Sequence, residues 1–123
     1  MKKKVLIVDD DPIIIEVLSV RLKMTGFEVL SAANGKEGLE KANREHPDLI
    51  ILDVIMPEMN GFETCRHLKE DPKTKDIPVI MLTSLSKEKD LEKGLEKGAD
   101  CFITKPFNSA DLMFEIKTAM GEA

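Results

Sequence analysis

Hydrophobic residues along this chain follow two alternating patterns. Short runs of large aliphatic residues predict strands, and longer stretches with apolar residues every three or four positions predict helices. The predicted strands are Lys4–Val8, Glu28–Ser31, Asp48–Leu52, Pro78–Leu82 and Cys101–Thr104. The first, third and fourth contain nearly continuous aliphatic runs, which are typical of strands covered on both faces in a parallel sheet. The segments around Val29 and Ile103 are more mixed and are expected at the sheet edges.

The first predicted helix has a signal at each end. Asp11 and Pro12 suit the N-cap and the first helical position, and Gly26 is expected to stop the helix. Between these ends, apolar residues recur at helical spacing. They are Ile14, Val17, Leu18 and Leu22.

Asparagine residues mark the start of further helices. Asn34 and Asn60 are each followed three residues later by a glutamate, as expected for an N-cap and a first helical turn. The last helix begins at Asn108 or Ser109 and has a clear apolar stripe. The stripe consists of Leu112, Met113, Ile116, Ala119 and Met120.

A fourth helix is predicted over residues 86–98, and its apolar stripe is thin. Leu91 and Leu95 are its only large apolar residues, and Gly94 lies in its interior. Weak anchoring makes it one of the easier elements to displace. Five strands alternating with five helices predict an α/β fold with a parallel sheet and right-handed crossovers.

Composition and charge narrow the functional classes. The 123 residues fit one domain, residues 1–123, and 42% hydrophobic with 33% charged residues is an ordinary globular balance. The net charge of −5 argues against direct binding to nucleic acid.

No signal peptide or apolar run of membrane-spanning length is recognised, so no membrane contact and a cytoplasmic location are expected. Cys65 and Cys101 lack the spacing of a metal site and are expected to be free thiols.

Polar residues follow the predicted strands. In a parallel sheet they would meet at one edge, where α/β proteins place their sites. Neighbouring carboxylates about 4 Å apart repel by on the order of 4 kcal/mol at an effective dielectric near 20, and an all-oxygen cluster suits Mg²⁺. A carboxylate in such a site can attack phosphorus and form an aspartyl phosphate. The residues concerned are Asp9, Asp10 and Asp11, then Asp53, Thr83 with Ser84, and Lys105.

Four motifs give the chain a resemblance to bacterial response-regulator receiver domains. Each is weak alone, but together they occur in the family's order and spacing and span essentially the whole chain. The resemblance implies a flavodoxin-like, doubly wound sheet of five parallel strands in the order 2-1-3-4-5. The motifs are Val8-Asp9-Asp10-Asp11-Pro12, Leu52-Asp53-Val54-Ile55-Met56-Pro57 with Gly61, Met81-Leu82-Thr83-Ser84, and Gly98-Ala99-Asp100 before Thr104-Lys105-Pro106-Phe107.

The resemblance also implies a phosphorylation site and a metal site. Asp53 would accept a phosphoryl group from a histidine kinase or a phosphotransfer protein. Asp10, Asp53 and the backbone carbonyl of Ile55 would bind Mg²⁺ directly, and Asp9 would act mainly through a metal-bound water. Such a chain is a signalling switch that catalyses its own phosphorylation and slow dephosphorylation, and is not a turnover enzyme.

Further residues are assigned to the switch by the same resemblance. Thr83 would bind the phosphoryl group, Lys105 would pair with it, and the Lys105–Pro106 bond would be cis. Phe102 occupies the position of an aromatic residue that moves inward on activation. The fourth helix, last strand and last helix would then present a changed surface to an effector protein or effector domain, or to a second copy in a homodimer.

Other interpretations of the same residues remain at this point. Asp10, Asp11 and Asp53 suit turns or caps, Lys105 a solvated surface, and Phe102 simple packing at an edge strand. A phosphatase of the haloacid-dehalogenase type also uses an aspartate after a strand, but its second aspartate would stand where Ile55 is. A flavodoxin-like redox carrier needs a phosphate-binding loop that the first aspartates would repel. A degenerate receiver is disfavoured by the intact Asp, Thr and Lys set.

Two apolar residues near the site lead to a hypothesis about its kinetics. Ile55 and Leu85 each lie two positions beyond a site residue, where side chains influence hydrolysis in the family. Neither can orient an attacking water. The phosphoryl group is therefore expected to be lost slowly.

Overall fold

The computed structural model describes residues 2–56, 58–83, 99–105 and 107–121. Its centre is a five-stranded parallel sheet in the order β2-β1-β3-β4-β5, which confirms the predicted fold and strand order. The mixed segments are the two edge strands, as predicted. The strands are β1 (Lys4–Val8), β2 (Glu28–Ala32), β3 (Leu49–Leu52), β4 (Val79–Thr83) and β5 (Cys101–Thr104).

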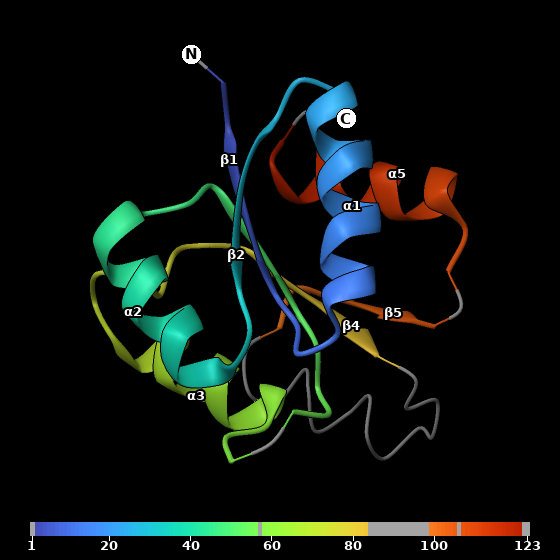
Figure 1. The fold of residues 1–123 in the computed structure, drawn as a ribbon. Coiled ribbons are helices and arrows are strands. Elements are labelled where there is room, and N and C mark those ends of the chain that lie inside the picture. Colours follow the sequence, from blue (N-terminus) through green and yellow to red (C-terminus); the bar gives the residue numbers. More distant parts are fainter. Residues whose placement is uncertain (1, 57, 84–98, 106, 122–123) are drawn as a thin grey trace.

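Helices cover both faces of the sheet (Figure 1). On one face, α1 (Pro12–Met24) and α5 (Ser109–Ala119) pack on one set of alternating strand residues. On the other face, α2 (Gly35–Glu45) and α3 (Gly61–Glu70) pack on the second set. Burial on both faces explains why β1, β3 and β4 have continuous aliphatic sequences. The predicted fourth helix lies outside the described residues.

The predicted boundaries differ slightly from the observed ones. The second strand extends to Ala32, the third begins at Leu49, and the fourth runs from Val79 to Thr83. Among the apolar residues that recur at helical spacing in α1, Leu18 and Leu22 are buried whereas Val17 is 55% exposed. The helix therefore presents a narrower apolar side to the core than its sequence suggests.

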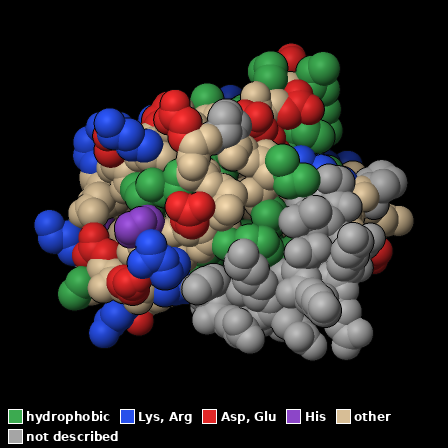
Figure 2. Space-filling view, turned by 90° about the horizontal axis from the view of Figure 1, so that it is seen from below, with side chains coloured by type: hydrophobic (Ala, Val, Ile, Leu, Met, Phe, Trp, Pro, Cys, Tyr) green, Lys and Arg blue, Asp and Glu red, His purple; other side chains and the backbone are tan. Residues whose placement is uncertain are grey.

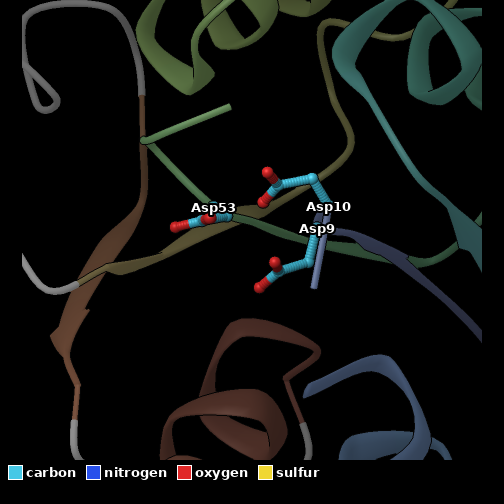
Figure 3. Close-up of side chains that lie close together, drawn as sticks. All are labelled: Asp9, Asp10 and Asp53. Atoms are coloured by element: carbon cyan, nitrogen blue, oxygen red, sulfur yellow. The ribbon is translucent and has the colours of Figure 1, made fainter. Parts of the chain in front are cut away.

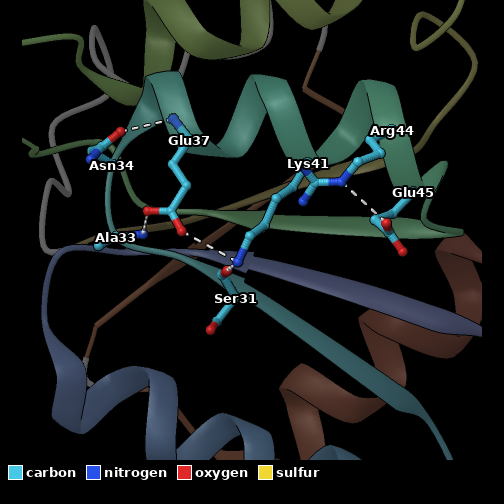
Figure 4. A network of polar contacts seen from close by, with 7 residues as sticks. All are labelled: Ser31, Ala33, Asn34, Glu37, Lys41, Arg44 and Glu45. Carbon is cyan, nitrogen blue, oxygen red and sulfur yellow. Dashed lines mark hydrogen bonds and ion pairs between the residues drawn. The ribbon is translucent and has the colours of Figure 1, made fainter.

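The N-terminal end of α2 shows how local sequence starts a helix (Figure 4). The side chain of Asn34 accepts the N–H of Glu37 at 2.8 Å, and the Glu37 carboxylate accepts the N–H of Ala33 at 3.1 Å. Lys41 pairs with Glu37 at 3.3 Å and donates to the carbonyl of Ser31 at the end of β2. The Ala33 N–H, followed by Lys41, lowers the pKa of Glu37. This network ties the start of α2 to the sheet edge.

Candidate functional site

The carboxyl end of β1 positions two aspartates with different environments. The N–H of Asp9 donates to the carbonyl of Ala32 at 3.1 Å, which continues the pairing with β2 by one residue. Asp9 is only 2% exposed, and its Oδ1 accepts the N–H of Asp11 at 2.9 Å. Asp10 is exposed. Asp11 is the N-cap of α1, as predicted, and accepts the N–H of Ile13 at 2.9 Å.

The carboxyl end of β3 holds Asp53 beside this pair. The N–H of Asp53 donates to the carbonyl of Val8 at 2.9 Å, and the residue is 6% exposed. Its Oδ1 accepts the N–H of Val54 at 2.9 Å. The loop then turns back, because the N–H of Gly61 donates to the carbonyl of Val54 at 2.8 Å. Only glycine fits there, since a Cβ at position 61 would overlap the carbonyl oxygen of Asp53.

The carboxylates of Asp9, Asp10 and Asp53 lie close together (Figure 3). One oxygen from each lies within 4.8 Å of the others, and two of the three residues are buried. Three clustered carboxylates repel each other unless a cation lies between them. The donor set consists of oxygen atoms and keeps one exposed member, so it fits a hard divalent cation that retains some of its water, such as Mg²⁺.

Lys105, which follows β5, supplies a positive charge to this cluster. Its Nζ lies 3.1 Å from Oδ2 of Asp9 and 3.6 Å from Oδ1 of Asp53. The side chain is partly buried, so its charge is less screened than that of a surface lysine. The sequence placed Lys105 at the site but did not predict the pair with Asp9. Only the observed reach of the side chain across the sheet reveals it.

The ionisation of Asp53 is strongly perturbed. Burial is the main cause, and the charge of Asp9 is the second; together they raise the pKa of Asp53 from 3.8 to about 6. The ammonium of Lys105 and the N–H of Val54 act in the opposite direction without cancelling the effect. A buried carboxylate whose pKa is raised by burial and by a charged neighbour marks a functional candidate.

The structure gives less detail for the remaining predicted site residues. Thr83 ends β4 and is paired with Thr104 of β5, so its backbone lies at the same sheet edge as Lys105. Phe102 is partly buried and packs against the core on the α2–α3 face. The side chain of Ile55 is 55% exposed beside Asp53. Ser84, Leu85 and the Lys105–Pro106 bond involve residues outside the described part of the chain.

The surface around this edge carries mixed charge (Figure 2). Lys and Arg side chains gather over α2 and α3, at the left of this view, but acidic side chains lie among them. Among the coloured residues of this face there is no continuous basic surface of the kind that binds a nucleic-acid backbone. None of the described helices is long and apolar enough to cross a membrane.

Comparison with known proteins gives consistent matches. Residues 5–117 match the response regulator receiver domain family. The chain is 43% identical over 119 residues to the probable transcriptional regulator ycf27 of Porphyridium aerugineum, covering 97% of this chain and 48% of that protein. It is 40% identical over 120 residues to the alkaline phosphatase synthesis transcriptional regulatory protein PhoP of Bacillus subtilis. This match covers 98% of this chain and 49% of that protein.

A solved structure agrees with these sequence matches. The chemotaxis protein CheY4 of Vibrio cholerae superimposes with a TM-score of 0.92 at 36% identity, covering 97% of this chain and 99% of that one. By contrast, the chain spans about half the length of the curated relatives it matches. The similarity therefore concerns one domain of those longer proteins.

Proposed function

Because the chain belongs to the response regulator receiver domain family, we propose that Asp53 is the residue whose phosphorylation operates this switch. Members of the family are phosphorylation-activated switches of two-component systems. The observation that supports Asp53 is its place in the cluster. It is buried, it lies beside two further carboxylates, and it is in contact with a lysine.

The geometry around Asp53 assigns a role to each of its oxygens. Oδ1 accepts the N–H of Val54 and faces Lys105, so Oδ2 is the oxygen we assign to attack on phosphorus. The new bond forms between Oδ2 and phosphorus while the bond from phosphorus to the donor breaks. The departing group keeps the electron pair of that bond.

Asp9, Asp10 and Asp53 are the residues that would hold Mg²⁺, together with the backbone carbonyl of Ile55. When bound, Mg²⁺ would supply positive charge to the carboxylates and to the oxygens of the phosphoryl group. Binding requires Asp53 to be ionised, so the cation and a proton compete for the same carboxylate. The raised pKa of Asp53 therefore makes both metal binding and nucleophilic attack weaker below about pH 6.

Lys105 and Thr83 would respond to the phosphoryl group. The ammonium of Lys105 lies between Asp9 and Asp53 and can pair with an oxygen on phosphorylated Asp53. Thr83 lies at the end of the neighbouring strand, where a hydroxyl would donate to a second oxygen. Movement of Thr83 would draw in Phe102 and change the surface formed by the fourth helix, β5 and α5.

The partners and setting follow from the same assignment. The phosphodonor is a histidine kinase or phosphotransfer protein, and the receiver of the signal is an effector protein or effector domain in the cytoplasm. We also propose that the phosphoryl group is lost slowly, since Ile55 at the rim and Leu85 cannot orient water. If the phosphorylated protein decayed within seconds in the presence of Mg²⁺, the proposal of slow hydrolysis would be contradicted.

Phosphorylation by acetyl phosphate tests the assignment of Asp53. With Mg²⁺, intact-mass measurement should show one phosphoryl adduct in the wild type and none in Asp53→Ala. Asp48→Asn is a matched control, because Asp48 bonds to the backbone of Lys4 far from the cluster and should leave the adduct unchanged. An undiminished adduct in Asp53→Ala would place the phosphorylation site elsewhere.

A further inference from the structure

The outer side of α1 carries an unexpected apolar stripe. Six large hydrophobic side chains are exposed among the described residues, and four of them belong to α1. At 100° per residue, the four positions fall within an arc of about 60° on the helix surface. The stripe consists of Ile13, Val17, Val20 and Met24, which are 68%, 55%, 54% and 80% exposed. Figure 1 shows α1 in front of the sheet, with this helix on the outside of the molecule.

The stripe has a symmetry that suits pairing with itself. Its four members are arranged symmetrically about the midpoint between Leu18 and Ser19. If two copies of α1 pack antiparallel across a two-fold axis at that midpoint, Ile13 of each copy lies opposite Met24 of the other. Val17 then lies opposite Val20. A two-fold interface requires this kind of self-complementarity.

The charges beside the stripe are complementary in the same arrangement. Glu16 and Lys23 are seven residues apart, so they lie on the same flank of the helix about two turns from each other. In the antiparallel pair, Glu16 of each copy lies beside Lys23 of the other. Neither side chain forms an ion pair within the described part of the chain, so both are available. In a parallel two-fold pair this flank would instead face the opposite flank of the other copy, so Glu16 and Lys23 would not meet.

We propose that the α1 stripe is the interface of a homodimer in which two copies of α1 pack antiparallel. The stripe lies on α1, and the pairing does not involve Asp53. It therefore forms without phosphorylation and does not depend on the proposed function. A single helix pair buries less than the roughly 800 Å² per partner of a standard interface, so a weak dimer that depends on protein concentration is expected.

Sedimentation equilibrium of the unphosphorylated chain from about 10 μM to about 1 mM tests the proposal. The apparent mass of the wild type should rise toward that of a dimer. Glu16→Lys and Lys23→Glu should each weaken dimerisation by about fivefold or more, because each places like charges together at both ends of the interface. The double variant Glu16→Lys/Lys23→Glu should restore the wild-type constant to within about twofold.

Two further variants locate the interface. Val20→Glu should abolish dimerisation, whereas Phe114→Glu is the matched control, because Phe114 is similarly exposed, at 64%, but lies on α5. Circular dichroism checks that each variant is folded. The proposal is overturned if the double variant is as weak as the single ones, or if Phe114→Glu acts as strongly as Val20→Glu. A wild type that stays monomeric also overturns it, and leaves a helix of another protein as the occupant of the stripe.

Discussion

Replacing Asp53 by asparagine is expected to stabilise the metal-free protein at neutral pH. Asparagine keeps the shape of the side chain and an oxygen that can accept the N–H of Val54. It removes a negative charge that is buried and lies near Asp9. Lys105 keeps its closer partner, since its Nζ lies 3.1 Å from Asp9. The substitution thus relieves repulsion without leaving a buried cation unpaired.

The size of this stabilisation follows from the pKa of Asp53. Between pH 3.8 and about 6, the folded state retains a proton that the unfolded state has released. The free energy of unfolding therefore falls as pH rises through this window. At about 1.4 kcal/mol per pH unit, the full cost is about 3 kcal/mol above pH 6. The asparagine variant avoids this cost, so its advantage over the wild type is near zero at about pH 4 and approaches about 3 kcal/mol at neutral pH.

Urea denaturation of both proteins in EDTA, repeated across pH, measures this advantage. The difference between the two unfolding free energies isolates Asp53, because all other groups titrate in both proteins. Asp48→Asn is the control for loss of one acidic charge, and should show no comparable gain. Added Mg²⁺ should stabilise the wild type more than the variant and shrink the gap. A variant that is less stable than the wild type at neutral pH, or a gap that does not depend on pH, would refute the reasoning.

Three other substitutions probe the supports of the site. Gly61→Ala should destabilise the protein by about 2 kcal/mol or more in urea denaturation, because its Cβ would overlap the carbonyl of Asp53; unchanged stability would contradict the close approach. Lys105→Met should raise the pKa of Asp53 above about 6, since it removes a positive charge 3.6 Å from Oδ1; an NMR titration giving an unchanged value would contradict this. Asn34→Ala should lower the free energy of unfolding by about 1 kcal/mol, because it removes the side chain that caps the start of α2. Unchanged stability in thermal unfolding would contradict this and show that Glu37 alone is enough to cap the helix.

Much of this fold is predictable from sequence because several signals agree. Continuous aliphatic runs require a strand buried on both faces, and the capping residues Asp11, Asn34 and Asn60 all occur where the helices begin. The chain positions of Asp53 and Lys105 after their strands then follow directly. The strand order came from the family resemblance, since alternation alone does not determine it.

Other features depend on packing that periodicity does not encode. Val17 matches the helical spacing of the α1 core, yet a helix lying on a sheet buries only a narrow side, and Leu18 and Leu22 fill it. The pair between Lys105 and Asp9 joins residues 96 positions apart and depends on side-chain reach. The pKa of Asp53 likewise depends on burial, which the sequence indicates only through the neighbouring aliphatic run.

The position of Lys105 suggests how a charge change could move the end of β5. With three ionised carboxylates and one ammonium, the cluster has a formal charge of −2, and Lys105 lies closer to Asp9 than to Asp53. A phosphoryl group would raise the negative charge at Asp53 to nearly −2, while a bound divalent cation would neutralise Asp9 and Asp10. The stronger attraction for Lys105 would then lie at Asp53. Lys105 directly follows Thr104, so a shift of its ammonium toward β3 would pull on the strand that carries Phe102 and precedes α5.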